Sequence, residues 1–105
     1  MASTDKERGF TRIPNELYDA MLSQKLSITQ ERALLYVIRK TYGFNKREDM
    51  ISISRMAEET GYSRRAMINA VHDLEKMGIL KLQKTRPGLP TYMSVNDLSF
   101  WDRDL

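Results

Sequence analysis

The chain has 105 residues, of which 41% are hydrophobic and 30% are charged, with a formal net charge of +3. This length corresponds to about one domain, so a cofactor-binding sheet with a separate substrate domain does not fit. The absence of cysteine excludes a disulfide framework and a thiolate zinc site, and a single histidine, His72, excludes the usual His-rich metal sites. No apolar run reaches the roughly 18 residues that cross a bilayer, so we expect a soluble, cytoplasmic protein without cofactors.

The domain organisation is predicted from changes in composition along the chain. Residues 1–8 (MASTDKER) are small, polar and charged, so we expect a disordered N-terminal arm there. Residues 9–101 have regular apolar patterns with no repeat and no long linker, which predicts one folded domain. Residues 102–105 are then a short C-terminal tail.

A first helix is predicted over residues 15–24, where Asn15 is placed to cap its start. Apolar residues recur there at helical spacing. These residues are Leu17, Tyr18, Met21 and Leu22.

A second helix is predicted over residues 29–42. Ser27 and Gln30 fit a capping box, in which each side chain accepts a hydrogen bond from the other residue's backbone N–H. Gly43 is placed to take the left-handed conformation that ends a helix. One apolar stripe is expected to face the core, formed by Ala33, Leu34, Val37, Ile38 and Thr41.

The centre of the chain then predicts a strand followed by a short helix. Residues 50–54 (MISIS) alternate between apolar and polar side chains, which is typical of a strand. Ser54 is placed to cap a helix over residues 55–60.

A longer helix is predicted after a three-residue turn that starts with glycine. Ser63 is placed to cap this helix, which runs to Met77. Gly78 ends it, and Ile79 is expected to pack back onto Leu74.

The last third of the chain changes to a strand period. Residues 79–85 and 91–95 alternate, and the turn-forming residues 86–90 lie between them, which predicts a hairpin. Asn96 is placed to cap a final helical turn over residues 97–101. The apolar C-terminal end either closes the core or forms a dimer contact, and its residues are Tyr92, Phe100, Trp101 and Leu105.

This order of elements predicts a mostly α fold with a small β wing, a winged helix-turn-helix. A short helix, a turn that starts with glycine and a longer helix form a helix-turn-helix. The hairpin that follows directly is the wing. Five elements in this order are a more specific signal than a helix-turn-helix alone.

The outer face of the longer helix carries the predicted DNA contacts. Arginine can form paired hydrogen bonds to guanine, asparagine can do so to adenine, and an exposed isoleucine can contact a thymine methyl group. Two arginines in the first turn oppose the helix dipole, which favours an external anion there. The predicted DNA-binding residues of this helix are Ser63, Arg64, Arg65, Ile68, Asn69 and His72.

Each of these residues also has a structural interpretation. Arg64, Arg65 and Asn69 could be solvated surface residues, and Ile68 could pack on the short helix. His72 lies two turns into the helix, so a solvated or phosphate-contacting role is favoured over base reading.

The hairpin tip adds Lys84 and Arg86 as predicted DNA contacts. Cations at this tip suit phosphate or minor-groove contact. The alternative is a solubilising strand edge, whose charges block pairing with other strands.

An enzyme is not expected. Asp73 and Glu75 share the longer helix, but at a spacing of two residues they do not face each other. The chain has no Gly-rich phosphate loop, no G-x-S-x-G motif and no nucleophile beside its only histidine.

Two segments carry a more specific signal, residues 9–17 (GFTRIPNEL) and residues 37–46 (VIRKTYGFNK). They resemble the N-terminal domain of the bacteriophage replication protein O family, the lambda O-like origin-binding initiators. The resemblance covers about residues 9–82. It implies a winged-helix domain that binds repeated sites in double-stranded DNA of a phage replication origin, with Ser63, Arg64, Arg65 and Asn69 as the matching DNA-reading positions.

The resemblance also implies partners. It implies a homodimer and recruitment of the host replicative helicase through a separate C-terminal part. Because the chain stops at Leu105, we expect that part to be absent here. Two competing hypotheses are a winged-helix transcriptional regulator and a protein-interaction module that does not bind DNA.

Overall fold

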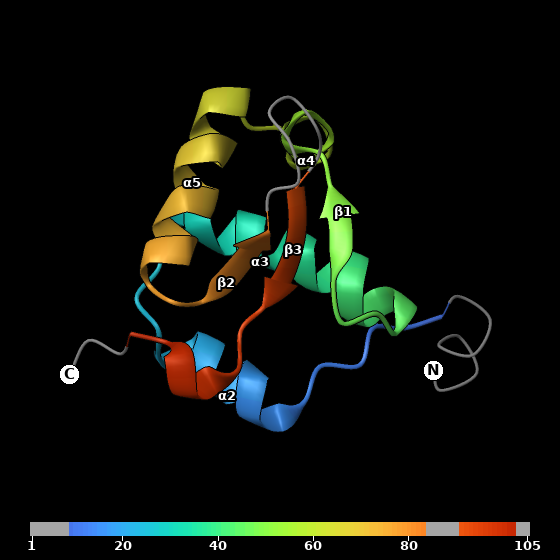
Figure 1. The fold of residues 1–105 in the computed structure, drawn as a ribbon, viewed down its shortest axis with the longest axis vertical. Helices are drawn as coiled ribbons and strands as arrows, with labels where there is room; N and C mark the ends of the chain where they lie inside the picture. Colours follow the sequence, from blue (N-terminus) through green and yellow to red (C-terminus); the bar gives the residue numbers. More distant parts are fainter. Residues whose placement is uncertain (1–8, 84–90, 103–105) are drawn as a thin grey trace.

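The computed structural model describes residues 9–83 and 91–102. Helix α3 (Ile28–Thr41) runs through the middle of the molecule (Figure 1). Most of the elements that follow it in the chain pack against it, including two helices and two strands of the sheet. The predicted stripe of α3 is buried, with no member more than 2% exposed. Thr41 is the one buried polar residue of the described core, and its hydroxyl donates a hydrogen bond to the Val37 carbonyl at 2.7 Å.

The start of α3 confirms the predicted capping box. The Gln30 backbone N–H donates to the Ser27 hydroxyl at 3.2 Å, and the Ser27 backbone N–H donates to the Gln30 side-chain oxygen at 3.0 Å. Both hydrogen bonds give partners to backbone N–H groups that the start of a helix otherwise leaves unpaired.

The end of α3 differs from the prediction. Gly43 does not adopt a left-handed conformation, because the chain tightens into the 3-10 helix η1 (Tyr42–Phe44). Asn45 takes that conformation instead, at φ 55°. Its short polar side chain makes this region accessible to a residue other than glycine. The α-helix itself ends at Thr41, one residue earlier than predicted, and the left-handed residue lies two positions later.

Helix α2 (Asn15–Ser23) confirms the first predicted helix but not its cap. Pro14 occupies the cap position, and no side chain there forms a capping hydrogen bond. The expected inner stripe is only partly buried, since Tyr18 and Leu22 are 52% and 72% exposed. Leu17 and Ala20 of α2 are buried in the core, and the half-buried Met21 packs against it.

The strand before the short helix ends earlier than predicted. Strand β1 spans Asp49–Ile51, and helix α4 spans Ile53–Thr60. Ser52, not Ser54, caps α4, because its hydroxyl accepts a hydrogen bond from the Arg55 backbone N–H at 3.3 Å. The apolar and polar residues therefore keep alternating up to residue 54, although the strand ends at Ile51 and the helix begins at Ile53.

Helix α5 (Arg64–Lys76) matches the predicted longer helix closely. The Ser63 hydroxyl accepts a hydrogen bond from the Ala66 N–H at 3.1 Å. At the other end Gly78 adopts φ 74°, and the N–H of Ile79 bonds to the carbonyl of Leu74 at 2.9 Å. Leu74 and Ile79 are fully buried, so the predicted packing across the helix end is confirmed.

The sheet has three antiparallel strands in the order β1-β3-β2. Strands β2 (Leu80–Gln83) and β3 (Thr91–Val95) pair antiparallel, which confirms the two predicted strands as neighbours. Leu80 lies opposite Val95. The other edge of β3 pairs with β1, a contact that the sequence did not indicate. The mostly α fold with a small sheet is confirmed, and residues 84–90 lie outside the described part.

The segment after β3 closes one end of the core. Asp97, not Asn96, caps the short 3-10 helix η2 (Leu98–Phe100) through the Ser99 N–H at 3.0 Å. Trp101 is only 5% exposed, whereas Phe100 is 67% exposed. Core closure is therefore correct for Trp101, and Leu105 lies outside the described residues.

Candidate nucleic-acid interface

The outer face of α5 presents most of the predicted DNA-binding residues to solvent. Ser63, Arg64, Arg65, Asn69 and His72 are exposed. Ile68 is half-buried instead, so its expected exposure is only partial.

The positive charge at the start of α5 is not offset within the first turn of the helix. The first turn contains two arginines and no acidic residue. Among residues 9–83 and 91–102, the ion pairs are Lys40–Glu59 and Lys46–Asp49, and neither involves Arg64 or Arg65. Two cations therefore sit at the positive end of the helix dipole, an arrangement that an external anion would relieve.

Ser54 of α4 also belongs to this surface, which the sequence pattern does not indicate. The Nε of Arg64 donates a hydrogen bond to the Ser54 hydroxyl at 3.2 Å. This contact holds Arg64 beside the first turn of α4. The sequence pattern places the Ser54 hydroxyl at a helix cap. Because Ser52 caps the helix instead, the Ser54 hydroxyl is available to Arg64.

The rotation of α5 about its own axis is fixed from its inner side. Its inner stripe packs on α3, and the Gln30 amide donates a hydrogen bond to the Asp73 carboxylate at 3.2 Å. Gln30 is already held by the capping box of α3, so one side chain ties the start of α3 to α5. The buried residues of that stripe are Met67, Ala70, Val71 and Leu74.

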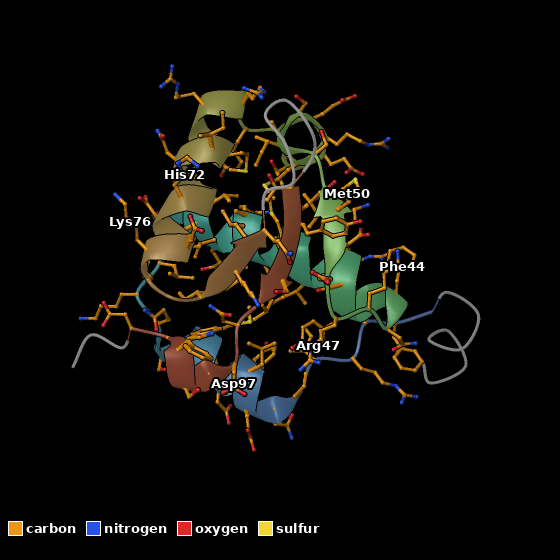
Figure 2. The ribbon with its side chains drawn as sticks, viewed as in Figure 1. Phe44, Arg47, Met50, His72, Lys76 and Asp97 are labelled. Atoms are coloured by element: carbon orange, nitrogen blue, oxygen red, sulfur yellow. The ribbon has the colours of Figure 1, made fainter. Side chains whose placement is uncertain are left out.

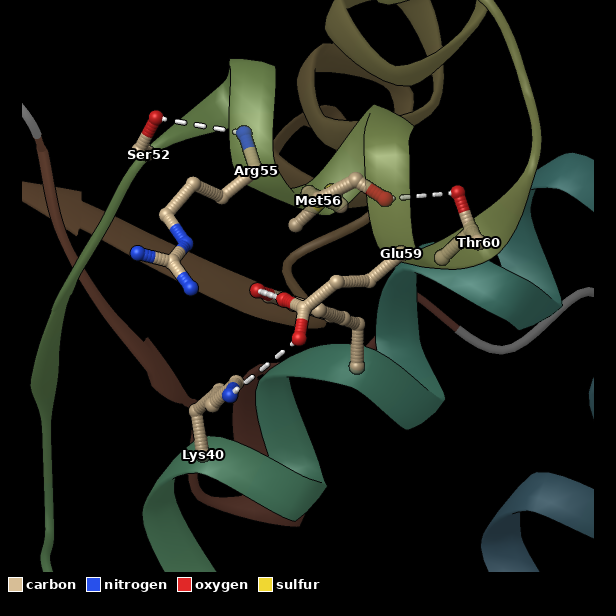
Figure 3. A network of polar contacts seen from close by, with 7 residues as sticks. Lys40, Ser52, Arg55, Met56, Glu59 and Thr60 are labelled. Carbon is tan, nitrogen blue, oxygen red and sulfur yellow. Dashed lines mark hydrogen bonds and ion pairs between the residues drawn. The ribbon is translucent and has the colours of Figure 1, made fainter.

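A polar network fixes α4 against α3 (Figure 3). The Tyr36 hydroxyl donates a hydrogen bond to the Glu59 carboxylate, and the Lys40 ammonium lies 3.9 Å from the same carboxylate. Burial and this hydrogen bond raise the pKa of Tyr36 above its usual value. The same hydrogen bond, which favours the ionised carboxylate, lowers the pKa of Glu59.

The β2–β3 pair extends the surface beside α5. Lys81 and Gln83 of β2 are exposed. Lys84 and Arg86, the predicted contacts at the tip, lie outside the described residues.

Within residues 9–83 and 91–102, no three acidic or histidine side chains converge in a way that could hold a metal ion. No helix there is long and apolar enough to cross a membrane.

The chain is similar in sequence to known proteins over most of its length. The family profile described as Bacteriophage replication protein O matches residues 2–100. DNA replication protein gp18 of Salmonella phage P22 is 36% identical over 93 residues, which cover 89% of this chain and 32% of that protein. Replication protein O of Escherichia phage lambda is 35% identical over 79 residues, covering 75% of this chain and 24% of the phage protein.

A third relative, replication protein 15 of Enterobacteria phage phi80, is 33% identical over 101 residues, covering 95% of this chain and 33% of that protein. All three relatives are replication proteins of bacteriophages. The chain belongs to the bacteriophage replication protein O family, as the resemblance had indicated. It spans about a quarter to a third of the length of these curated relatives.

Proposed function

We propose that this chain is the DNA-binding domain of a phage replication initiator, a winged helix-turn-helix that binds repeated origin sites in double-stranded DNA. The observation that carries the proposal is the exposed pair Arg64 and Arg65 at the start of α5, where no acidic residue of that turn offsets their charge. A helix start of this kind suits insertion into a major groove.

The arrangement around α5 supports this interpretation. Helices α4 and α5 are joined by a short turn at Gly61, and the β2–β3 pair follows α5 directly (Figure 1). In the proposed complex α5 is the recognition helix and the β2–β3 pair is the wing. The Ser54–Arg64 hydrogen bond orients one arginine before DNA arrives, which lowers the entropic cost of binding.

The side chains of the interface have distinct proposed roles. Arg64 and Arg65 read guanine, Asn69 reads adenine, and the accessible part of Ile68 meets a thymine methyl group. The remaining residues bind phosphates, and they are Ser63, His72, Lys84 and Arg86.

The proposed role is DNA binding without catalysis. It also involves a second copy of the chain. The chain binds as a homodimer, because repeated or palindromic sites favour two-fold symmetry. Recruitment of the host helicase belongs to a part of the longer relatives that this chain does not match. The competing protein-interaction hypothesis relied on an exposed Ile68, and that residue is half-buried.

The test is a binding titration with duplex DNA that contains the origin repeats, against a scrambled duplex of equal length. We expect tighter binding to the repeats and an affinity that falls steeply with salt. Arg65→Ala is expected to weaken repeat binding by about 1–3 kcal/mol. Arg47→Ala is the matched control, because Arg47 is exposed and lies far from the upper end of α5 (Figures 1 and 2).

The outcomes separate the roles of the arginines and bear on the proposal itself. A loss confined to one base position marks base reading, and a uniform loss across sequences marks phosphate contact. Equal affinity for repeat and scrambled duplex, or no dependence on salt, would overturn the proposal.

A further inference from the structure

A second surface of the molecule combines exposed aromatic rings with cations. Phe10 and Phe44 are 59% and 54% exposed. The guanidinium of Arg12 lies 5.1 Å from the ring centre of Phe10, and that of Arg39 lies 5.0 Å from the ring centre of Phe44. The Lys46 ammonium lies 5.9 Å from the Phe44 ring centre. We call these five residues the aromatic–basic cluster.

The end of α3 builds this cluster through Gly43. A Cβ atom at this position would lie 2.6 Å from the Arg39 guanidinium and 3.2 Å from the Thr11 hydroxyl. The missing side chain therefore lets Arg39 and the N-terminal segment approach η1 closely. A pocket of about 300 Å³ results, and it is lined by Gly9, Phe10, Thr11, Arg39, Gly43 and Phe44.

The cluster carries positive charge that the described residues do not neutralise. Lys46 pairs with Asp49 at 3.3 Å. Neither Arg12 nor Arg39 forms an ion pair within residues 9–83 and 91–102. No acidic residue lines the pocket.

The chemistry of the cluster selects a ligand with negative charge and flat aromatic faces. Unpaired nucleotides have both, because their phosphates attract the guanidinium groups and their bases stack on aromatic rings. Paired bases of a duplex hide these faces in the stack. We infer that the aromatic–basic cluster binds unpaired nucleotides of a single strand.

This binding site is separate from the proposed duplex interface. Figure 2 shows Phe44 on the opposite side of the molecule from His72 and Lys76 of α5. A duplex held by α5 would therefore leave the cluster accessible. Binding of a single strand at the cluster and binding of a duplex at α5 can therefore be lost independently of each other.

The test is a fluorescence anisotropy titration of the full chain with a labelled oligo(dT) strand at low salt. The double variant Phe10→Leu with Phe44→Leu keeps apolar bulk but removes both aromatic faces. We expect it to weaken oligo(dT) binding about tenfold or more, since stacking is sequence-tolerant and depends on the ring. Phe44→Trp alone should retain or strengthen binding, and oligo(U) in place of oligo(dT) shows whether the site prefers DNA or RNA.

Two controls make the result specific. Phe100→Leu changes a similarly exposed phenylalanine that lies outside the cluster, and we expect unchanged oligo(dT) binding. Arg65→Ala should weaken duplex binding and leave oligo(dT) binding unchanged. A failure of the duplex proposal can therefore be distinguished from a failure of the single-strand proposal. Circular dichroism checks that each variant keeps its helix content.

Three outcomes would overturn the inference. The first is undetectable oligo(dT) binding by the unmodified chain at low salt. The second is equal binding by the double leucine variant, or an equal loss with Phe100→Leu. The third is self-association of the unmodified chain that rises with its concentration, is abolished in the double leucine variant and is seen while no oligo(dT) binding is detected. That result would mark the cluster as a protein contact.

Discussion

Gly61 and Gly78 both adopt left-handed conformations, at φ +81° and +74°, but their surroundings differ. A Cβ atom at Gly61 would meet no other atom within 4 Å. At Gly78 it would lie 2.0 Å from the Phe100 carbonyl oxygen. The backbone of the C-terminal segment thus lies against the end of α5 at Gly78, where no side chain intervenes.

This difference predicts two unequal losses of stability. Gly61→Ala should cost about 1–2 kcal/mol, because only the left-handed backbone is strained. Gly78→Ala adds overpacking against a backbone carbonyl, so we expect about 2–5 kcal/mol. Urea unfolding of the two variants measures both values, and equal losses would contradict the close approach of Phe100.

The Tyr36–Glu59 hydrogen bond predicts a specific pH dependence. Because folding lowers the pKa of Glu59 below its usual 4.5, the folded state favours the ionised carboxylate. This contribution to stability is complete above pH 4.5 and is lost as the pH falls through the lowered pKa. Tyr36→Phe should raise the pKa of Glu59 toward its usual value, as followed by NMR titration.

Asp97 provides an internal control for that titration. Its pKa is lowered by the Ser99 N–H, which Tyr36 does not contact. We therefore expect the pKa of Asp97 to be the same in Tyr36→Phe and in the unmodified chain. A change at both carboxylates would point to a general loss of structure.

At the scale of elements, two serines separate helix capping from the proposed interface. Ser52 caps α4, and Ser54 accepts a hydrogen bond from Arg64. Ser52→Ala should therefore lower the free energy of unfolding by about 1 kcal/mol. Ser54→Ala should leave stability within about 0.5 kcal/mol and weaken duplex binding modestly, because Arg64 loses its orienting contact.

Denaturant unfolding and a duplex titration on both variants check this division. If Ser54→Ala were the destabilising change instead, Ser54 would be the residue that caps α4, as the sequence alone predicts.

The predictable elements were those whose signals agree with one another. Helix α5 was predicted nearly to the residue because its cap, inner stripe and terminal glycine all indicate the same bounds. The start of α4 was not, because strand alternation and two candidate capping serines overlap within residues 50–54. At the end of α3, both Gly43 and Asn45 can adopt the left-handed conformation, so local backbone preference does not decide between them.

Only the part of the proposed interface that lies on a single helix could be predicted from the sequence. The exposure of Arg64, Arg65 and Asn69 follows from subtracting the inner stripe of one helix. The contribution of Ser54 depends on how two helices meet, which no single-helix pattern contains. The pairing of β1 with β3 is likewise a contact between distant segments.

At the scale of the whole molecule, the C-terminal segment belongs to the core. The Trp101 indole donates a hydrogen bond to the Asn96 carbonyl at 3.1 Å, and the Asp102 N–H donates to the Met77 carbonyl at 2.7 Å. These contacts join the segment after β3 to the end of α5.

Trp101→Ala should therefore destabilise the domain by about 3–5 kcal/mol, as expected for a large buried side chain. The neighbouring Phe100→Ala should cost less than about 0.5 kcal/mol, because most of that side chain is in solvent. Thermal unfolding followed by circular dichroism compares the two, and similar melting temperatures would show that the segment is not part of the core.

The strand order has a consequence for synthesis on the ribosome. The central strand β3 comes last along the chain, so β1 and β2 have no partner until residues 91–95 have been made. The contacts within and between α3, α4 and α5 are available earlier, but the sheet and Trp101 are not. A nascent chain that stalls before β3 would expose two unpaired strand edges and an open core, which makes it a substrate for chaperones and proteases. Folding of this domain is thus tied to completion of β3 and of the segment that carries Trp101.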